Sequence, residues 1–219
     1  MKATELNIHA AMAALSQKRR IFHLEGDFQF ALAWELQSQC SSHKIRLEKP
    51  VYYDEDWCID IEVRADAGIF PIELKYLKKA LVFEDIDGTG KEKYILAQGV
   101  HDIEMYSCFA DIARLEKHCR ETPGVTAGYA LWLTNDPKYW DEHAFTSYYK
   151  PFHPYEGSRK SGELYFNTVI ERTGKPPKIR NMKGYTEPVF LNGSYLINWH
   201  DYSDLGVPGG KFKYTVVRV

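Results

Sequence analysis

The sequence predicts a single mixed α/β domain in which a β-sheet is flanked by helices. Three observations indicate this class. Apolar residues recur with a helical period over residues 24–39, three strand-like segments follow, and a longer helical pattern over residues 96–118 precedes another strand. The chain of 219 residues is long enough for one full hydrophobic core, and no segment has the composition of a linker.

The composition is that of a globular protein and gives no sign of a membrane or secreted protein. Hydrophobic residues make up 44% and charged residues 26% of the chain. No apolar run approaches the ~20 residues of a membrane span, and Glu5 and His9 interrupt the apolar core that a signal peptide would need. The four cysteines form no C-x-x-C pair, and scattered thiols fit a reducing compartment. We therefore expect a cytoplasmic protein.

The first half of the chain is expected to contain two helices and then three strands. A short helix is predicted over residues 5–18 and a second over 24–39, where Phe28, Leu32 and Leu36 share one face. Strands are predicted over residues 45–51, 57–64 and 69–76. Residues 81–94 are expected to be a loop, because Asp-Gly and Thr-Gly pairs are turn formers.

The second half is expected to begin with a helix over residues 96–118 and a buried, aromatic-rich strand over 128–134. Residues 137–188 are rich in tyrosine, proline and basic residues, and are expected to form an irregular elaboration of the same domain. Two strands, 195–199 and 211–219, should close the chain.

The segment IDIEVRADAGIFPIELKY, residues 59–76, has the pattern of a β-hairpin. Its turn is residues 65–68, where Gly68 can supply a positive φ. Symmetric pairing about this turn places Asp60 across from Glu73. The opposite face is expected to be one apolar surface, made of Ile59, Ile61, Val63, Phe70, Ile72 and Leu74.

The charged face of this hairpin suggests a chemical site. Directly opposed residues have Cβ atoms roughly 4.5–5.5 Å apart, so Asp60 and Glu73 should repel each other unless a cation lies between them. Mg²⁺ prefers such oxygen ligands. Lys75, about 6–7 Å further along the strand, could orient or deprotonate a water or stabilise a phosphate. The set is suited to phosphodiester hydrolysis.

An alternative needs no chemistry, because a half-exposed antiparallel hairpin shows the same alternation of polar and apolar residues. Glu62 and Arg64 share the charged face and have no evident catalytic role. A pattern of two carboxylates and a lysine is also short enough to occur by chance.

The order of these elements resembles the PD-(D/E)xK nuclease superfamily, whose restriction-endonuclease-like fold has an α-β-β-β-α-β core. That superfamily carries an aspartate on the second strand and (D/E)-x-K on the third. Here the matching residues are Asp60 and Glu73-Leu74-Lys75, and Ile59 stands in place of the proline. The match covers about residues 22–134, and the chain looks most like small bacterial members of the superfamily.

The resemblance implies a metal-dependent nuclease, a DNA endonuclease in which Mg²⁺ or Mn²⁺ is held by Asp60, Glu73 and the carbonyl of Leu74, while Lys75 assists the attacking water. Glu25 on the preceding helix would support the metal, with Glu35 as second choice. Glu25 could instead be a carboxylate favoured by the helix dipole. Gln29, one turn after Glu25, can face the same way. The resemblance is also compatible with a homodimer, because restriction-like nucleases often pair to cut both strands. The alternative function is a catalytically silent module that binds nucleic acid or a protein partner.

A nucleic-acid surface would have to be local, since the net charge of the chain is −2. Basic and aromatic residues that bind phosphates and stack on bases occur in three groups. These groups are Lys78, Lys79, Lys91 and Lys93; Lys150, Arg159 and Lys160 with Tyr148, Tyr149, Phe152 and Tyr155; and Arg172, Lys175, Lys178, Arg180 and Lys183. For any single residue, a solvated or packed position is the simpler interpretation.

Overall fold

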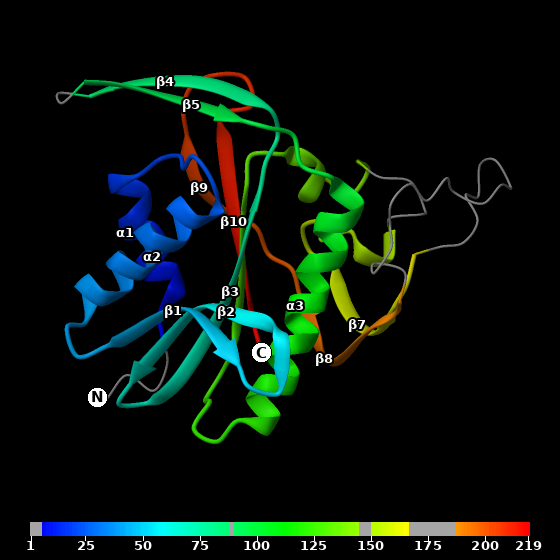
Figure 1. Ribbon diagram of the computed structural model, residues 1–219. Helices are drawn as coiled ribbons and strands as arrows, with labels where there is room; N and C mark the ends of the chain where they lie inside the picture. The colour runs from blue at the N-terminus through cyan, green and yellow to red at the C-terminus, as the bar shows by residue number, and fades with distance from the viewer. Residues whose placement is uncertain (1–5, 88–89, 145–149, 167–186) are drawn as a thin grey trace, which may run out of the picture.

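The computed structural model describes residues 6–87, 90–144, 150–166 and 187–219. In these residues a six-stranded mixed sheet forms the centre of the molecule (Figure 1). Its strands, in spatial order, are β1 (Lys44–Val51), β2 (Asp54–Ala65), β3 (Gly68–Leu77), β6 (Tyr129–Thr134), β10 (Lys211–Arg218) and β9 (His200–Asp204). The sheet is antiparallel except where β6 pairs in parallel with β3.

Helices cover both faces of the sheet. Helices α1 (Ile8–Lys18) and α2 (Glu25–Gln39) lie on one face, and α3 (His101–Glu121) lies on the other, as Figure 1 shows. Because α3 connects two parallel neighbours, it is the crossover that such a pair requires. The predicted mixed α/β class is confirmed, with the elements in the expected order α2, β1, β2, β3, α3 and β6.

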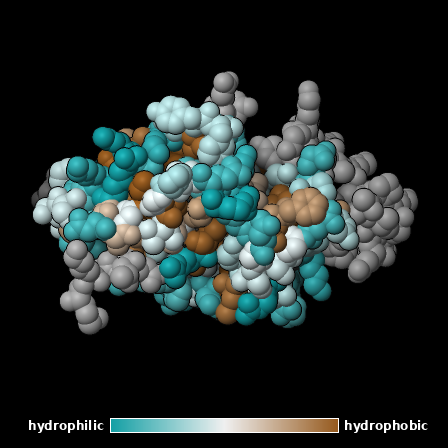
Figure 2. All heavy atoms as spheres, turned by 90° about the horizontal axis from the view of Figure 1, so that it is seen from below, coloured by the Kyte–Doolittle hydropathy of each residue, from teal (hydrophilic) through white to brown (hydrophobic). Residues whose placement is uncertain are grey.

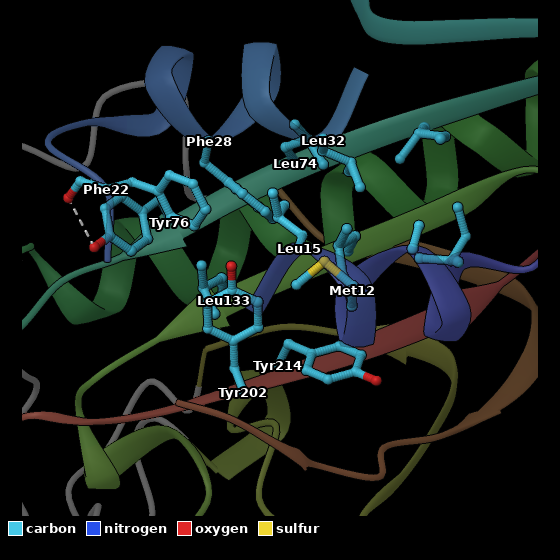
Figure 3. Close-up of a cluster of buried hydrophobic side chains, with 14 of the residues drawn as sticks. Met12, Leu15, Phe22, Phe28, Leu32, Leu74, Tyr76, Leu133, Tyr202 and Tyr214 are labelled. Atoms are coloured by element: carbon cyan, nitrogen blue, oxygen red, sulfur yellow. Dashed lines mark hydrogen bonds between the residues drawn. The ribbon is translucent and has the colours of Figure 1, made fainter. Parts of the chain in front are cut away.

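The helices bury two separate cores against the sheet. Figure 3 shows part of the first core, where Met12 and Leu15 of α1 and Phe28 of α2 meet side chains of the sheet. Tyr76 joins this core and donates its hydroxyl to the carbonyl oxygen of Phe22 at 3.0 Å. The second core packs Phe109 of α3 against the sheet. With both faces covered, the central strands have no exposed side.

The predicted loop over residues 81–94 is wrong. The segment forms a hairpin of β4 (Leu81–Asp87) and β5 (Gly90–Leu96), which projects past the sheet in Figure 1. Its strands pair Glu84 with Lys93, which are oppositely charged neighbours, while Leu81 and Leu96 are buried at its base. Turn formers close a hairpin as readily as they mark a loop.

The predicted irregular region also contains regular structure. Two short 3₁₀-helices, η1 (Pro137–Tyr139) and η2 (Lys150–Phe152), precede a hairpin of β7 (Arg159–Leu164) and β8 (Val189–Leu196). The predicted strand over 195–199 is divided, because β8 ends at Leu196 and β9 starts at His200. The basic cluster between residues 172 and 183 lies outside the described residues.

The face of the molecule seen in Figure 2 is mostly polar. Figure 2, seen from below, shows hydrophobic residues in small groups that hydrophilic residues separate. Among the described helices, none combines the length and apolar character required to cross a membrane.

Candidate active site

The charged side of β3 is buried beneath α3. The parallel register pairs Glu73 with Ala130 and Lys75 with Trp132, which places both charged residues on the face that α3 covers. The exposed fraction of Glu73 is only 3%. The alternative of an ordinary half-exposed hairpin therefore does not describe this strand, and its charged groups need partners inside the protein.

The hairpin register predicted from the sequence is confirmed near the turn and fails at Asp60. Arg64 pairs with Ile69, and Gly68 has φ 131°, as expected. The ladder then ends at Ile61, which pairs with Ile72. Asp60 is not paired with Glu73; its Oδ2 instead accepts a hydrogen bond of 2.6 Å from the backbone N–H of Leu74. The carboxylate replaces the strand partner that Leu74 would otherwise have.

Strand β2 changes faces at this position. Ile61 packs in the first core, whereas Ile59, two residues earlier, packs in the second. The prediction that Ile59 shares an apolar face with Ile61 is therefore wrong. Residues two apart share a face only in a regularly pleated strand, and β2 is not regular at Asp60.

Glu73 is a buried acid with one hydrogen-bond donor. The indole Nε1 of Trp57 donates to its Oε1 at 2.9 Å. Burial raises the pKa of Glu73 well above its ordinary value, and the negative charges of Asp111 and Asp60 raise it further. Glu73 therefore ionises readily only when positive charge is brought to it.

Lys75 is held as a cation. Burial alone would lower the pKa of Lys75, but Asp111 and Glu25 outweigh burial and raise it above its ordinary value. The Nζ of Lys75 lies 2.7 Å from Oδ2 of Asp111 and donates to the carbonyl oxygen of Leu74 at 3.2 Å. A lysine in this state cannot take a proton from water, but it can donate hydrogen bonds to an anion.

Glu25 reaches the same strand from the first turn of α2. Its Oε2 accepts a hydrogen bond of 2.7 Å from the backbone N–H of Tyr76. Its negative charge also contributes to raising the pKa of Asp60. Glu35, the second choice, instead binds Lys18 at 2.6 Å. Glu25 thus begins α2 and also contacts β3, so its position agrees with both interpretations and does not separate them.

The pKa of the Asp60 carboxyl lies near neutral pH. Burial raises its pKa to about 7, against the hydrogen bond from Leu74 and the charge of Lys75, which lower it. Glu25 and Asp111 contribute to the rise. A carboxyl with such a pKa gains strongly from a nearby cation, because the cation removes the repulsion between the acids.

Four residues of the site were not singled out as site residues from the sequence. Asp111 and Arg114 come from α3, Trp57 from β2 and Gln29 from α2. Asp111 is fully buried and binds both Lys75 and Arg114. The sequence did contain a signal for Asp111: it is an acidic residue within the apolar stripe of α3 that includes Phe109 and Ile112, which indicates a buried charge. Gln29, expected only to face the same way as Glu25, donates to the carbonyl oxygen of Asp60 at 2.7 Å.

The acidic side chains of the site are oxygen donors, the kind of ligand that a hard divalent cation prefers. The four carboxylates of the site, which are Glu25, Asp60, Glu73 and Asp111, are accompanied by two cations, Lys75 and Arg114. Asp60 and Glu73 each use one carboxylate oxygen in the hydrogen bonds given above. No group of three or more His, Cys, Asp or Glu side chains in the described part of the chain is placed to hold a metal. A cation here would thus depend on two acids and a backbone carbonyl, with water completing its shell.

Two residues of the nucleic-acid surface expected from the sequence are buried in the structure. Phe152 is fully buried, and Lys160, only 7% exposed, donates to the carbonyl oxygens of Lys150 and Pro151. Burial lowers the pKa of Lys160 to about 8. Neither residue is available to a strand of nucleic acid, whereas Lys78 and Lys79 directly follow β3 and its charged residues.

Comparison of the chain with protein families, with curated proteins and with solved structures found no match.

Proposed function

We propose that the chain is a divalent-cation-dependent nuclease of the restriction-endonuclease-like class, an endonuclease that hydrolyses phosphodiester bonds of DNA. One observation carries the proposal. Where β2 leaves β3, the carboxylate of Asp60 turns to the backbone of Leu74 and comes beside the buried Glu73 and Lys75. Two acids of raised pKa and a fixed cation, brought together from the neighbouring strands β2 and β3, form a combination typical of functional sites.

In this proposal Asp60, Glu73 and the carbonyl of Leu74 would hold Mg²⁺ or Mn²⁺. Such an ion supplies a Lewis acid and a water that ionises more readily. Lys75, held as a cation by Asp111, stabilises the negative charge that grows on the phosphate. Of the roles considered for Lys75, this assignment favours stabilisation of the phosphate over deprotonation of a water, because a lysine whose pKa is raised cannot serve as a base. Glu25 supports the site by fixing the backbone at Tyr76.

One specific observation favours the alternative of a catalytically silent module. Asp60 and Glu25 already accept hydrogen bonds from the N–H groups of Leu74 and Tyr76 along the edge of β3 that β2 has left. Buried N–H groups need such partners in any fold, whether or not chemistry occurs there. In this reading Lys75 and Asp111 are a structural ion pair.

A plasmid-cleavage assay separates the two. Supercoiled DNA is incubated with Mg²⁺ or Mn²⁺, with EDTA as the metal-free arm, and with single-stranded DNA and RNA in parallel. We expect the wild-type chain to nick the plasmid only with the cation. Glu73→Gln mimics the protonated acid and so should fold, yet its cleavage rate should fall on the order of 100-fold or more.

The matched control is Glu84→Gln, which makes the same change on β4, where Glu84 forms an exposed ion pair with Lys91. It should cleave at the wild-type rate. Cleavage that persists in EDTA, or that survives Glu73→Gln, contradicts the proposal, and wild-type inactivity on all three substrates favours the silent module.

A further inference from the structure

Glu48 has a strained backbone next to the site. Its φ is 47°, and it is the one non-glycine residue with positive φ in the described part of the chain. This conformation costs a glutamate about 1–2 kcal/mol and persists only when the surroundings impose it. Glu48 lies within strand β1 and its side chain is exposed, so burial of the side chain does not account for the strain.

The strained residue lies across from Asp60. Leu47 pairs with Ile61, and Lys49 with Ile59, so Glu48 stands opposite Asp60 in the register between β1 and β2. This is also the level at which β2 leaves β3 and changes faces. The positive φ of Glu48 in β1 therefore lies directly across from the place where β2 leaves β3.

One side chain connects the two strands here. Nε2 of Gln29 donates to Oε1 of Glu48 at 2.6 Å and to the carbonyl oxygen of Asp60 at 2.7 Å. Gln29 is 7% exposed and comes from α2, one turn after Glu25. Its amide is thus oriented by Glu48 and in turn fixes the backbone of Asp60.

We infer that Glu48 and Gln29 are positioning residues for Asp60. The left-handed turn at Glu48 brings its carboxylate to Gln29, and Gln29 fixes the peptide whose rotation sends the Asp60 side chain toward Leu74. Strain retained at an exposed residue beside buried acids is expected where position matters to function. The inference rests on the proposed function, since it assigns these residues to the same site.

The test uses Glu48→Gly in the full chain. Glycine adopts a φ of 47° without strain, so the melting temperature should stay equal or rise. If the carboxylate positions Asp60, the Mn²⁺ affinity measured by calorimetry should fall about 10–100-fold, as for other partners that orient metal ligands. The cleavage rate at saturating DNA should fall similarly, with little change in KM.

A third measurement requires no metal. The backbone N–H of Leu74, which donates to Asp60, should exchange with solvent faster in Glu48→Gly than in the wild type. Glu48→Gln keeps the acceptor oxygen and loses the charge, so it should restore the wild-type exchange rate of Leu74 and the wild-type Mn²⁺ affinity. The matched control is Glu163→Gly, an exposed position of β7, which should lose stability and leave the site unchanged.

The outcomes are distinguishable. A wild-type chain that neither binds Mn²⁺ nor cleaves overturns the proposed function, and the exchange rate of the Leu74 amide then decides the positioning role alone. An unchanged exchange rate of Leu74 and unchanged Mn²⁺ affinity in Glu48→Gly overturn the inference. A loss shared equally by Glu48→Gln also overturns it, because the effect would then be one of charge and not of position.

Discussion

The Nζ of Lys75 lies 2.7 Å from the Oδ2 of Asp111, a residue with no exposed surface in the middle of α3. This ion pair joins the central strand of the charged site to the helix that covers it. Asp111 also binds Arg114, whose guanidinium lies 5.6 Å from the centre of the Trp57 ring. Trp57 in turn donates to Glu73. Lys75 and Glu73 are thus connected through successive contacts of Asp111, Arg114 and Trp57.

Removing Asp111 should therefore affect both stability and chemistry. In Asp111→Ala, Lys75 and Arg114 lose their buried counter-charge, and breaking such a pair costs about 3–5 kcal/mol. Denaturant unfolding should show this loss. Asp111→Asn should fold better but lower the pKa of Lys75 and reduce cleavage, since it keeps the shape and removes the charge.

The control on the same helix is Glu121→Gln, whose exposed ion pair with Arg120 should contribute almost nothing to stability. If Asp111→Ala unfolds at the same denaturant concentration as this control, the ion pair does not stabilise the packing of α3 on β3.

The contribution of Asp60 to the stability of the metal-free protein should fall as the pH rises from about 4 to about 7. Asp60 keeps its proton to about pH 7 when folded, whereas the unfolded carboxyl releases it near 3.8. Between these values the folded state binds more protons at Asp60, so this residue's share of the free energy of unfolding decreases with pH. Glu73, whose pKa is also raised, acts in the same direction.

Asp60→Asn removes the titrating group and should flatten this dependence. The variant should match the wild type near pH 4 and be more stable above pH 7, by at most about 4 kcal/mol. Urea unfolding at a series of pH values, with EDTA present, measures it. If the difference in unfolding free energy between Asp60→Asn and the wild type stays constant over this range, Asp60 does not titrate there in the fold.

Glu116 should hold the β7–β8 hairpin on α3. It accepts hydrogen bonds from the backbone N–H groups of Asn192 and Gly193 and from the hydroxyl of Tyr195, between 2.6 and 2.8 Å. These bonds lower its pKa despite burial. Glu116→Ala leaves those donors without a partner and should cost about 2–4 kcal/mol. This is less than the sum of about 1.5–3 kcal/mol for each hydrogen bond to a charged group, because bonds that share one acceptor are not additive.

Hydrogen exchange gives a local readout of this contact. The amides of Asn192 and Gly193 should exchange much faster in Glu116→Ala, while those of β3 should change little, because local opening is separable from global unfolding. Glu163→Gln, an exposed glutamate on β7, is the comparison. Equal protection in the two variants would show that the hairpin is held by its apolar contacts.

The sequence predicted the class of fold and the hairpin register because both depend on local signals. Side-chain alternation and Gly68 fixed the pairing of Arg64 with Ile69. The same alternation could not show that β2 leaves the ladder at Asp60, because a strand pattern carries no information on where a strand rotates. Ile59 was therefore assigned to the wrong face.

The partners from distant elements were harder to predict. Asp111 is 36 positions after Lys75 in sequence, and only the packing of α3 on the sheet brings them together. Glu48 gave no signal at all, because positive φ at a glutamate cannot be read from its residue type. Asp60 and Glu73, in contrast, were singled out from the sequence because carboxylates are ligands that a hard cation prefers.

The most direct test of the account is a calorimetric titration of the metal-free protein with Mn²⁺ at pH 8, where Asp60 is largely ionised. We predict one site of micromolar affinity, lost in Asp60→Asn and in Glu73→Gln and retained in Glu84→Gln. Titration of the wild type at pH 6 should show weaker binding, since protons compete for Asp60. Absence of Mn²⁺ binding, or binding that both site variants retain, would contradict the claim that these acids exist to hold a cation.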